Sequence, residues 1–587
     1  MVVSTVGVLA GAMAVGGLAA RARSRFLLSR AKHPSLAGHP RISRRIASVL
    51  PFYEYDERSF FRCDNSPEVI AIRREEGFRR LSELYAQKFS RTRAATAAIA
   101  RRASDLQFTS AYRVPFQFSR FVQERLSPGS VLSSAGGVTV TDLDGNVMYD
   151  VGGSYGVNLL GYDFYKACIA RGAALVGDLG PVLGSYHPAL HDNVERLCRI
   201  SGLDEVSFHM SGTEAVMQAV RLARYHTRRS HLVRFCGAYH GWWGAVQPGI
   251  GNPALERDTY TLADMSDHTL RVLRTRRDIA CVLVNPLQAL HPNQAAPSDG
   301  ALVGASAEAH PDLENYAQWL RQLRELCTAR GIVLIFDEVF VGFRLAPGGA
   351  QEYFGVRADL VTYGKTLGGG LPVGVLCGRR AFMRRTREGR PADVCLARGT
   401  FNSHPYVMGA MNEFLRALET AEVLRLYRGL DDVWASRASQ LNASLRDAEL
   451  PVSVEHLSSI WTVRYPRPSR YNWMLQYYMG AEGLALSWVG TGRLIFSLNY
   501  TDEDFAEVAR RFVAAAKAME RDGWWRTDPA ASNKAIRRQI LREMAVMRRR
   551  SWTARATFGE GGDVVPDDAP ASQRSADGGS GPSPGYL

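Results

Sequence analysis

Acidic residues are absent from the first fifty positions of the chain, whereas the same segment holds eight Arg and Lys. Residues 534–550 are almost as one-sided, with seven basic residues against a single acid, Glu543. These two segments account for the whole formal charge of +14, so the body between them is formally neutral. A neutral body argues against nucleic acid as a partner, because nucleic-acid affinity depends on basic residues that meet phosphates. Basic ends favour an anionic membrane surface or, alternatively, solvated tails without a partner.

Paired cysteines are also lacking. The eight cysteines are scattered over 587 residues, none forms a CxxC pair, and none lies near a histidine at the spacing of a zinc site. This pattern argues against a disulfide framework and predicts reduced, mostly buried thiols in a cytoplasmic compartment. We therefore expect no metal ion. Hydrophobic residues make up 46% and charged residues 22% of the chain, a globular balance that excludes disorder of the whole.

Charge of either sign is missing from residues 1–20, a run rich in Val, Ala, Gly and Leu. Its length is close to that of one bilayer crossing, and a basic cluster follows at once from Arg21. A secretory signal has its positive charge before the apolar run, whereas charge after the run keeps the body on the cytoplasmic side. We expect residues 1–20 to anchor a cytoplasmic protein to the inner face of a membrane. The alternative is a weakly hydrophobic Gly- and Ala-rich helix.

Residues 21–135 read as a basic, helical N-terminal extension. Within it, the charges of residues 67–89, which include Arg73 and Arg74, are typical of a solvated helix face. From residue 136 the sequence pattern changes. Apolar runs of strand length alternate with segments of helical periodicity up to about residue 400. The strand candidates are residues 205–209, 231–235, 280–284, 331–336 and 360–362. This alternation predicts an α/β fold with a mainly parallel sheet.

The remaining boundaries follow from composition. Residues 136–404 form the expected large domain, and residues 405–525 a smaller α+β domain that ends in a helix over 502–519. Residues 526–552 are expected to be a basic helical segment. Residues 553–587 are rich in Gly, Ser, Pro and Asp, which predicts a disordered tail.

Three separated elements can carry chemistry. Ser211-Gly212-Thr213 opens a helix after a strand, which would present free backbone N–H groups to a phosphate. Asp337 ends an apolar strand, at the edge where α/β folds bind ligands. Lys365 follows a strand and precedes the glycines 368–370, and a lysine whose pKa is lowered can condense with an aldehyde. Taken singly, these residues read as a helix cap, a strand-end cap and a surface lysine.

In their order and context, these motifs resemble the class III (fold-type I) aminotransferases that use pyridoxal 5′-phosphate (PLP), above all the glutamate-1-semialdehyde 2,1-aminomutases. The resemblance covers roughly residues 136–515. It is carried by the motifs at residues 210–217, 237–241, 334–344, 348–351, 364–365 and 399–400. It implies a large domain with a seven-stranded, mainly parallel sheet, a smaller α+β domain, and PLP as cofactor.

The resemblance also implies residue roles. Lys365 corresponds to the Schiff-base lysine that moves the proton, and Asp337 to the carboxylate on the pyridine nitrogen. Further positions would surround the cofactor: Ser211, Gly212 and Thr213 at its phosphate, Tyr239 stacked on the ring with His240 beside it, and Val339 behind the ring. Thr400 corresponds to the hydroxyl that reaches the phosphate bound by a partner subunit, which implies a homodimer with shared active sites.

Substrate contacts are less well marked. Tyr155 occupies the position of a substrate-side aromatic residue. Ser110 and Arg113 have the spacing of the pair that holds the substrate carboxylate in the aminomutases, although their flanking sequence differs. Arg493 is a second candidate partner for a carboxylate, or else a solvated arginine at a strand end. Asn285 stands before Pro286, where family members often have Glu.

The resemblance implies an aminotransferase that moves an amino group from an amino-acid donor to an aldehyde or ketone acceptor. An aminomutase that moves the group within one substrate is the alternative of the same fold. The alternative of another class is a catalytically inactive scaffold at a membrane. The basic ends suggest an amphiphilic acceptor, since a soluble pathway enzyme needs no anchor.

Overall fold

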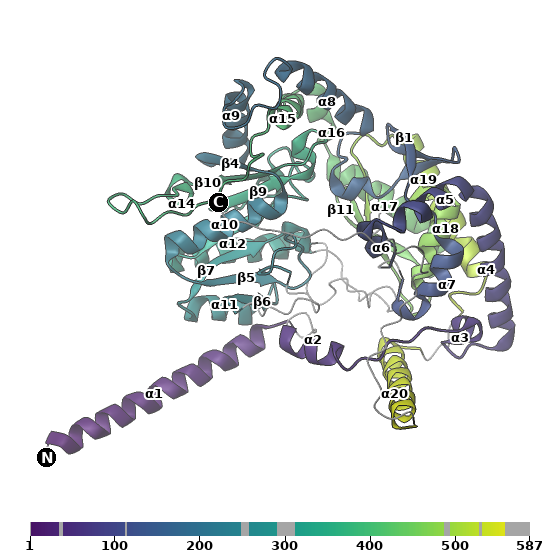
Figure 1. Cartoon of the computed structure of the whole chain (residues 1–587), viewed down its shortest axis with the longest axis horizontal. Coiled ribbons are helices and arrows are strands. Elements are labelled where there is room, and N and C mark those ends of the chain that lie inside the picture. Colours follow the sequence, from purple (N-terminus) through teal and green to yellow (C-terminus); the bar gives the residue numbers. More distant parts are fainter. Residues whose placement is uncertain are drawn as a thin grey trace, which may run out of the picture.

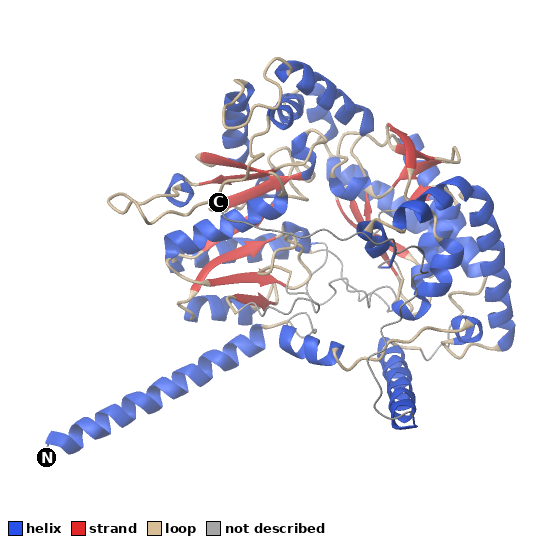
Figure 2. Cartoon of the chain, viewed as in Figure 1, coloured by secondary structure: helices blue, strands red, loops and turns tan. Residues whose placement is uncertain are grey.

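The computed structural model describes residues 2–33, 39–111, 114–247, 257–289, 312–486, 493–526 and 531–557. Within these ranges, the side chains of residues 2–14, 16–17, 40, 108–111, 288–289 and 550–557 lie outside the description. Figures 1 and 2 show a body of helices packed around three sheets.

The largest sheet has seven strands in the order β4-β10-β9-β8-β7-β5-β6. Neighbouring strands are parallel except at β10, which is antiparallel to both β4 and β9. The strands are β4 (Glu205–His209), β5 (His231–Phe235), β6 (Thr259–Leu262), β7 (Ile279–Val284), β8 (Val333–Asp337), β9 (Leu360–Gly364) and β10 (Gly374–Gly378). Every residue of β7, β8, β9 and β10 is buried, as expected for strands covered on both faces. The predicted fold class is confirmed.

Helices cover this sheet. The long α10 packs against β4, β7, β8, β9 and β10, and α12 packs against β8. Helices α8, α9 and α15 form a cluster beside them, although α15 lies beyond the expected boundary at residue 405. Their bounds are α8 (Tyr162–Val176), α9 (Ala189–Ser201), α10 (Gly212–Thr227), α11 (Asp267–Thr275), α12 (Leu313–Arg330), α13 (Gly349–Phe354), α14 (Arg380–Met383) and α15 (Pro405–Leu418).

The C-terminal part contains an antiparallel sheet of β11 (Ser453–Leu457), β12 (Ile460–Arg464) and β14 (Arg493–Ile495). A second small sheet joins β1 (Leu132–Gly136), β2 (Thr139–Asp142) and β3 (Val147–Asp150) to β13 (Leu484–Ala485). The first strands of the body therefore pair with a strand near its end, and β1 begins before residue 136. The accompanying helices are α16 (Ala421–Leu426), α17 (Leu430–Asp447), α18 (Leu475–Ala481) and α19 (Asp502–Arg521). The domain boundaries expected from sequence remain a proposal.

The N-terminal extension is helical, as predicted. It comprises α1 (Val2–Ala31), α2 (Pro40–Ala47), α3 (Glu57–Arg62), α4 (Glu68–Lys88), α5 (Ser90–Ala100), α6 (Ser104–Ala111) and α7 (Phe116–Leu126). One expectation is wrong. Arg74 does not lie on a solvated face but is fully buried, donating to Asp64 at 2.8 Å and to the Gly523 carbonyl at 3.0 Å. Its guanidinium lies 4.4 Å from the centre of the Tyr471 ring, so this helix packs on the C-terminal part.

The first helix, α1, and the last helix of the described residues, α20, both project from the body (Figure 1). The last turns of α1 pack on α11, and the Ala31 carbonyl accepts a hydrogen bond of 2.9 Å from the amide of Ala263. Across the described residues, no helix is both long enough and apolar enough to cross a membrane. Most side chains of the anchor predicted at residues 1–20 lie outside the described part, so the anchor stays a prediction.

The last helix, α20 (Asn533–Thr557), agrees with the predicted basic helical segment but continues past residue 552. The start of the predicted tail, at 553–557, is therefore helical. The rest of that tail, 558–587, lies outside the described residues.

Candidate active site

Lys365 follows β9, at the carboxyl edge of the parallel sheet. Its backbone φ of 48° lies in the left-handed region, which is uncommon for a residue other than glycine. The Nζ atom donates a hydrogen bond of 2.5 Å to the carbonyl oxygen of Tyr155 and lies 4.8 Å from the centre of the Phe340 ring. Burial, with the nearby charges of Arg344 and Arg493, lowers the pKa of Lys365 to about 8. About a tenth of the amine is therefore neutral at pH 7, far more than for a lysine with the ordinary pKa of 10.5.

Asp337 ends the neighbouring strand β8 and is buried. Its Oδ2 atom lies 2.7 Å from Nδ1 of His240, and its Oδ1 atom accepts hydrogen bonds from the Thr362 hydroxyl and the Val339 amide. The Nε2 atom of His240 is buried without a hydrogen-bond partner among the described residues. A carboxylate oriented by a histidine and a threonine is held in a fixed position, as required for a group that contacts a cofactor ring.

The first turn of α10 lies beside these two strands. The Ser211 hydroxyl caps the helix by accepting from the amide of Glu214 at 3.3 Å. A Cβ atom on Gly212 would lie 2.6 Å from Cγ1 of Val339, so only glycine fits there. A Cβ atom on Gly241 would similarly lie 2.4 Å from Oγ1 of Thr213. The segment after β8, the start of α10 and the turn after His240 are thus in close contact. Gly212 and Val339, which touch here, are more than a hundred positions apart in the sequence.

A turn over residues 153–156 supplies the acceptor for Lys365. Four consecutive residues have positive φ: Gly153 (56°), Ser154 (45°), Tyr155 (58°) and Gly156 (90°). Asp150 holds the turn, because its Oδ1 atom accepts from the amides of Gly152 and Gly153 at 3.0 Å. Ser154 and Tyr155 are strained there, because only glycine adopts positive φ at little cost, and such strain persists only where surrounding contacts impose it.

Two arginines lie near the amine of Lys365, since both lower its pKa. Arg344 is fully buried and donates to the carbonyls of Phe496, Asn158 and Gly156, so it joins the sheet edge to the C-terminal part. Arg493 begins β14, burial lowers its pKa to about 10, and its Nε atom is buried with no partner among the described residues. A buried Nε–H group without a partner favours an anion beside this arginine.

The remaining predicted residues are placed as follows. Tyr239 is 62% exposed and its carbonyl accepts from Asn285 at 3.5 Å, so Asn285 supports the segment that bears Tyr239 and His240. Tyr155 is half exposed, and Thr400 is exposed on the surface of the single chain. Arg113 and the side chain of Ser110 lie outside the described residues.

Sequence reasoning missed several participants. The Tyr155 carbonyl is a backbone group, which leaves no sign in a sequence. Arg344 stands in the motif of residues 334–344 but had no assigned role. Phe340, whose ring packs against Gly156 and faces Lys365, follows Val339 directly and could have been inferred from that position.

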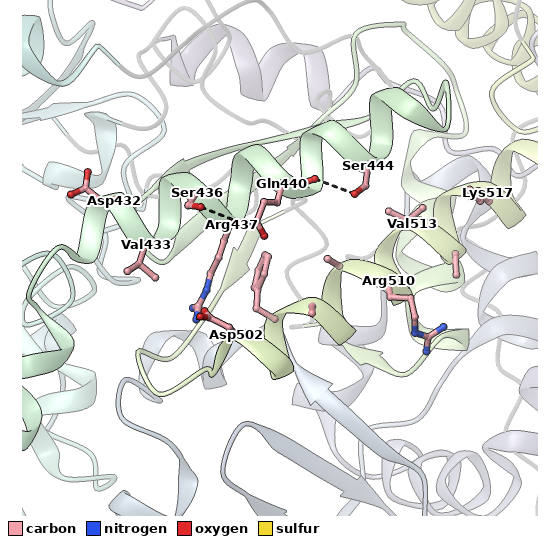
Figure 3. Close-up of a pocket in the computed structure, with 14 residues that line it drawn as sticks. Asp432, Val433, Ser436, Arg437, Gln440, Ser444, Asp502, Arg510, Val513 and Lys517 are labelled. Carbon is pink, nitrogen blue, oxygen red and sulfur yellow. Dashed lines mark hydrogen bonds and ion pairs between the residues drawn. The ribbon is translucent and has the colours of Figure 1, made fainter.

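A groove of about 910 Å³ lies elsewhere, between α17 and α19 (Figure 3). Apolar side chains such as Phe505 and Val513 line it, and Arg437 donates to Asp502 at its edge at 2.8 Å. It contains none of the residues expected to carry chemistry, so we do not assign it to the site.

Comparison with known proteins agrees with this geometry. The sequence profile of the family Aminotransferase class-III matches residues 123–249 and 302–516. A glutamate-1-semialdehyde 2,1-aminomutase of Alkaliphilus oremlandii is 35% identical over 296 residues, which cover 48% of this chain and 64% of that protein. The same enzyme of Nitratidesulfovibrio vulgaris is 35% identical over 338 residues, covering 57% of this chain and 76% of that protein. A solved transaminase with PLP bound has a TM-score of 0.59 and 26% identity, covering 74% of this chain and 99% of that one.

The seven-stranded sheet, with a lysine and a carboxylate at its carboxyl edge, defines a fold-type I PLP-dependent enzyme. The profile matches more than half of the chain, and the chain therefore belongs to the class III aminotransferase family. The match to the Alkaliphilus aminomutase spans slightly less than two thirds of that protein's length.

Proposed function

We propose that the chain is a PLP-dependent aminotransferase that moves an amino group from an amino-acid donor to an aldehyde or ketone acceptor. The observation that carries this proposal is the position of Lys365. Its amine, with a pKa of about 8, lies at the end of β9, next to the strand end that holds Asp337. An aldehyde-reactive amine beside a buried carboxylate and a free helix start fits the three functional ends of PLP.

The residues present fit the cofactor. Lys365 would bind its aldehyde, and the first turn of α10, with Ser211, Gly212 and Thr213, would bind its phosphate. Asp337 would contact its pyridine nitrogen, where His240 and Thr362 keep the carboxylate in place. When bound, PLP supplies an electron sink that stabilises negative charge on the substrate carbon.

The chain's own residues then handle protons and orientation. Lys365 is the group suited to take and return the substrate proton, because an amine with a pKa near 8 can act in both directions at neutral pH. The Tyr155 carbonyl and the Phe340 ring orient the amine. Val339 packs against Gly212 and Gly364 and would support the back of the ring, whereas Tyr239 would cover its open face.

Arg493 supports an amino-acid donor. Its charge lowers the pKa of Lys365 and its Nε atom is buried without a partner among the described residues, so the guanidinium would be available to a substrate carboxylate. Ser110 and Arg113 remain proposals for the same role. The basic, partly apolar ends of the chain support an amphiphilic carbonyl acceptor.

A homodimer with shared active sites is part of the proposal. Thr400 is exposed and makes no hydrogen bond within the described part of the chain, so its hydroxyl is available to the phosphate site of a second copy. Mixing the Lys365→Ala and Thr400→Val variants under conditions that exchange subunits should restore part of the activity if the sites are shared. If the mixture is no more active than the two variants are separately, the active sites are not shared.

The main experiment is a screen of amino donors against carbonyl acceptors with purified protein, read by mass spectrometry. We expect one donor to release its keto acid while an acceptor gains the amino group. Lys365→Ala should abolish this and the absorbance of the bound cofactor. Lys517→Ala, a change at an exposed lysine on α19, should alter neither.

Intramolecular transfer, as in an aminomutase, is the second candidate, favoured by the two aminomutases that are 35% identical. A single-turnover experiment separates the two reactions. An aminomutase that starts with the amine form of its cofactor needs no separate donor and releases no keto acid. An inactive scaffold would show neither reaction.

A further inference from the structure

The two basic ends of the chain meet on one side of the molecule. Figure 1 shows α1, α2 and α20 along the same edge of the body. The contact between the ends is direct, since the hydroxyls of Tyr53 and Tyr55 donate to Glu543 of α20 at 2.9 and 2.6 Å. Tyr53 follows the end of α2 by only six residues. Two segments that are far apart in the sequence therefore form one surface, which is independent of the proposed amino transfer.

Only positive charge remains on the outer side of α20. Glu543 is the one acid of this helix, and its carboxylate turns inward to the buried Arg470, at 2.6 Å, besides the two tyrosines. Arg537, Arg538 and Arg542 are exposed to solvent. The helix is thus fixed to the body through its single negative charge and presents its arginines outward.

Apolar side chains are exposed among these arginines. On the N-terminal side, Phe52 is 74% exposed, and Ile42, Val49 and Leu50 are also exposed beside Arg41 and Arg45 of α2. On α20, Leu541 is 62% exposed. Single exposed apolar residues are ordinary, but a group of them between arginines is the composition of a segment that lies in a membrane interface.

We propose that this basic face, defined as α2, residues 49–52 and α20, docks peripherally on an anionic phospholipid surface. The arginines would meet the negative head groups, and the apolar side chains would enter the boundary between head groups and acyl chains. RNA would attract the same arginines, but exposed Ile, Val and Leu gain nothing from a phosphate backbone and do not stack on bases. The composition therefore favours lipid.

The test uses the full-length protein with its cofactor and vesicles of phosphatidylcholine, alone or mixed in equal parts with phosphatidylglycerol. Co-sedimentation should be strong with the anionic vesicles at low salt and should weaken as salt rises. The variant Arg41→Glu/Arg45→Glu/Arg537→Glu/Arg538→Glu should bind these vesicles at least about tenfold more weakly. Phe52→Ser should weaken binding less, but at all salt concentrations.

Arg101→Glu/Arg102→Glu is the control that matches Arg537→Glu/Arg538→Glu in net charge, because both of its side chains are exposed just beyond the end of α5, away from the basic face (Figure 1). It should bind as the unchanged protein does. Amino transfer with soluble substrates should be equal in all variants, so that a failure of the proposed reaction is distinguishable from a failure of docking.

Three outcomes would overturn the proposal. Equal binding to neutral and anionic vesicles, unaffected by the four charge reversals, would assign the binding to the apolar residues 1–20. Equal weakening of vesicle binding by Arg101→Glu/Arg102→Glu and by Arg537→Glu/Arg538→Glu would show that net charge alone matters. Tight binding of single-stranded RNA without binding to anionic vesicles would make nucleic acid the partner.

Discussion

The amine of Lys365 donates a hydrogen bond of 2.5 Å to the carbonyl oxygen of Tyr155, 210 residues earlier in the chain. The acceptor is a backbone group in a turn in which four successive φ angles are positive, and the Asp150 carboxylate holds this turn through the amides of Gly152 and Gly153. The geometry of the reactive amine therefore depends on a strained turn, and changes in that turn should affect the site without removing any reactive group.

Gly156→Ala tests this dependence. At a φ of 90°, a Cβ atom would lie 2.5 Å from Cε2 of Phe340, so both the backbone and the ring must shift. We expect a loss of about 2–4 kcal/mol in the free energy of unfolding and at least a tenfold fall in kcat. Thermal denaturation and steady-state kinetics measure the two effects.

Gly145→Ala is the control, since its φ is 85° but a Cβ atom would meet nothing within 4 Å. It should cost only about 1 kcal/mol and leave kcat unchanged. If both variants lost activity equally, strain in general, rather than the position of the Tyr155 carbonyl, would be responsible.

The pKa of Lys365 gives a second prediction. In the cofactor-free protein, the rate of modification of Lys365 by an amine-reactive reagent should rise with pH and level off above about 8, because only the neutral amine reacts. Peptide mapping by mass spectrometry follows this residue separately. Exposed lysines such as Lys517 should still react faster as the pH approaches 10. If the rate of modification of Lys365 reaches half of its maximum only above pH 10, the lowered pKa is contradicted.

The same shift affects stability. The pKa of Lys365 falls from 10.5 to about 8 on folding, so the unfolded chain binds more protons between these values. The free energy of unfolding should therefore rise with pH across this window through Lys365, whereas below about pH 8 burying the protonated amine costs stability. Lys365→Met should remove this pH dependence. In the absence of cofactor, its free energy of unfolding should therefore exceed that of the unchanged protein most at neutral pH, where the buried amine is protonated. Denaturant titrations of both proteins across the window measure the difference.

Asp337→Asn removes the negative charge that His240 and Thr362 keep in place. We expect kcat to fall at least about a hundredfold, while the cofactor stays attached through Lys365. Thr362→Val, which removes one hydrogen bond at 3.2 Å to the same carboxylate, should cost about tenfold or less. Kinetics and the absorbance of the bound cofactor measure both variants, and an unchanged kcat in Asp337→Asn would rule out its role.

Arg493→Leu separates carboxylate binding from chemistry. The Nε atom of Arg493 is buried without a partner among the described residues, so loss of this side chain should raise KM for amino-acid donors about tenfold or more and change kcat little. Arg493→Lys should restore only part of the affinity for amino-acid donors, because an ammonium cannot bind a carboxylate in a bidentate way. Amine donors without a carboxylate provide the control. If KM for these amines rises as much as KM for the amino acids does, Arg493 is a structural residue.

How far the sequence predicts this site depends on the kind of contact. β7, β8 and β9 are buried on both faces, so their apolar runs mark them, and Asp337 and Lys365 follow from their places at or just beyond strand ends. The register that brings His240 to Asp337 is a long-range relationship. It could be expected only through resemblance to a known family.

Other features could not be predicted for physical reasons. The Tyr155 carbonyl is a backbone group, and its orientation depends on contacts with Asp150 and Phe340 that appear only after folding. Arg74 follows a charged pattern that is typical of an exposed face, but its guanidinium is enclosed by Asp64 and Tyr471. A pattern of charges along one helix cannot reveal a partner elsewhere in the chain.

Glu543 links the last helix to the body, and its removal should release that helix. Arg470 is 1% exposed and donates to Glu543 at 2.6 Å, so Glu543→Ala leaves a buried guanidinium with its strongest partner missing. We expect a loss of about 3 kcal/mol, of which detachment of α20 can recover a part. Glu543→Gln retains acceptors for Tyr53 and Tyr55 and should lose less. Trypsin should cleave at the exposed Arg537 and Arg538 faster in Glu543→Ala than in Glu543→Gln, while cleavage at Arg101 and Arg102 should be the same in both variants. If Arg537 and Arg538 are cleaved at the same rate in the two variants, as Arg101 and Arg102 are, then α20 is held by other contacts, such as that of the buried Ile536.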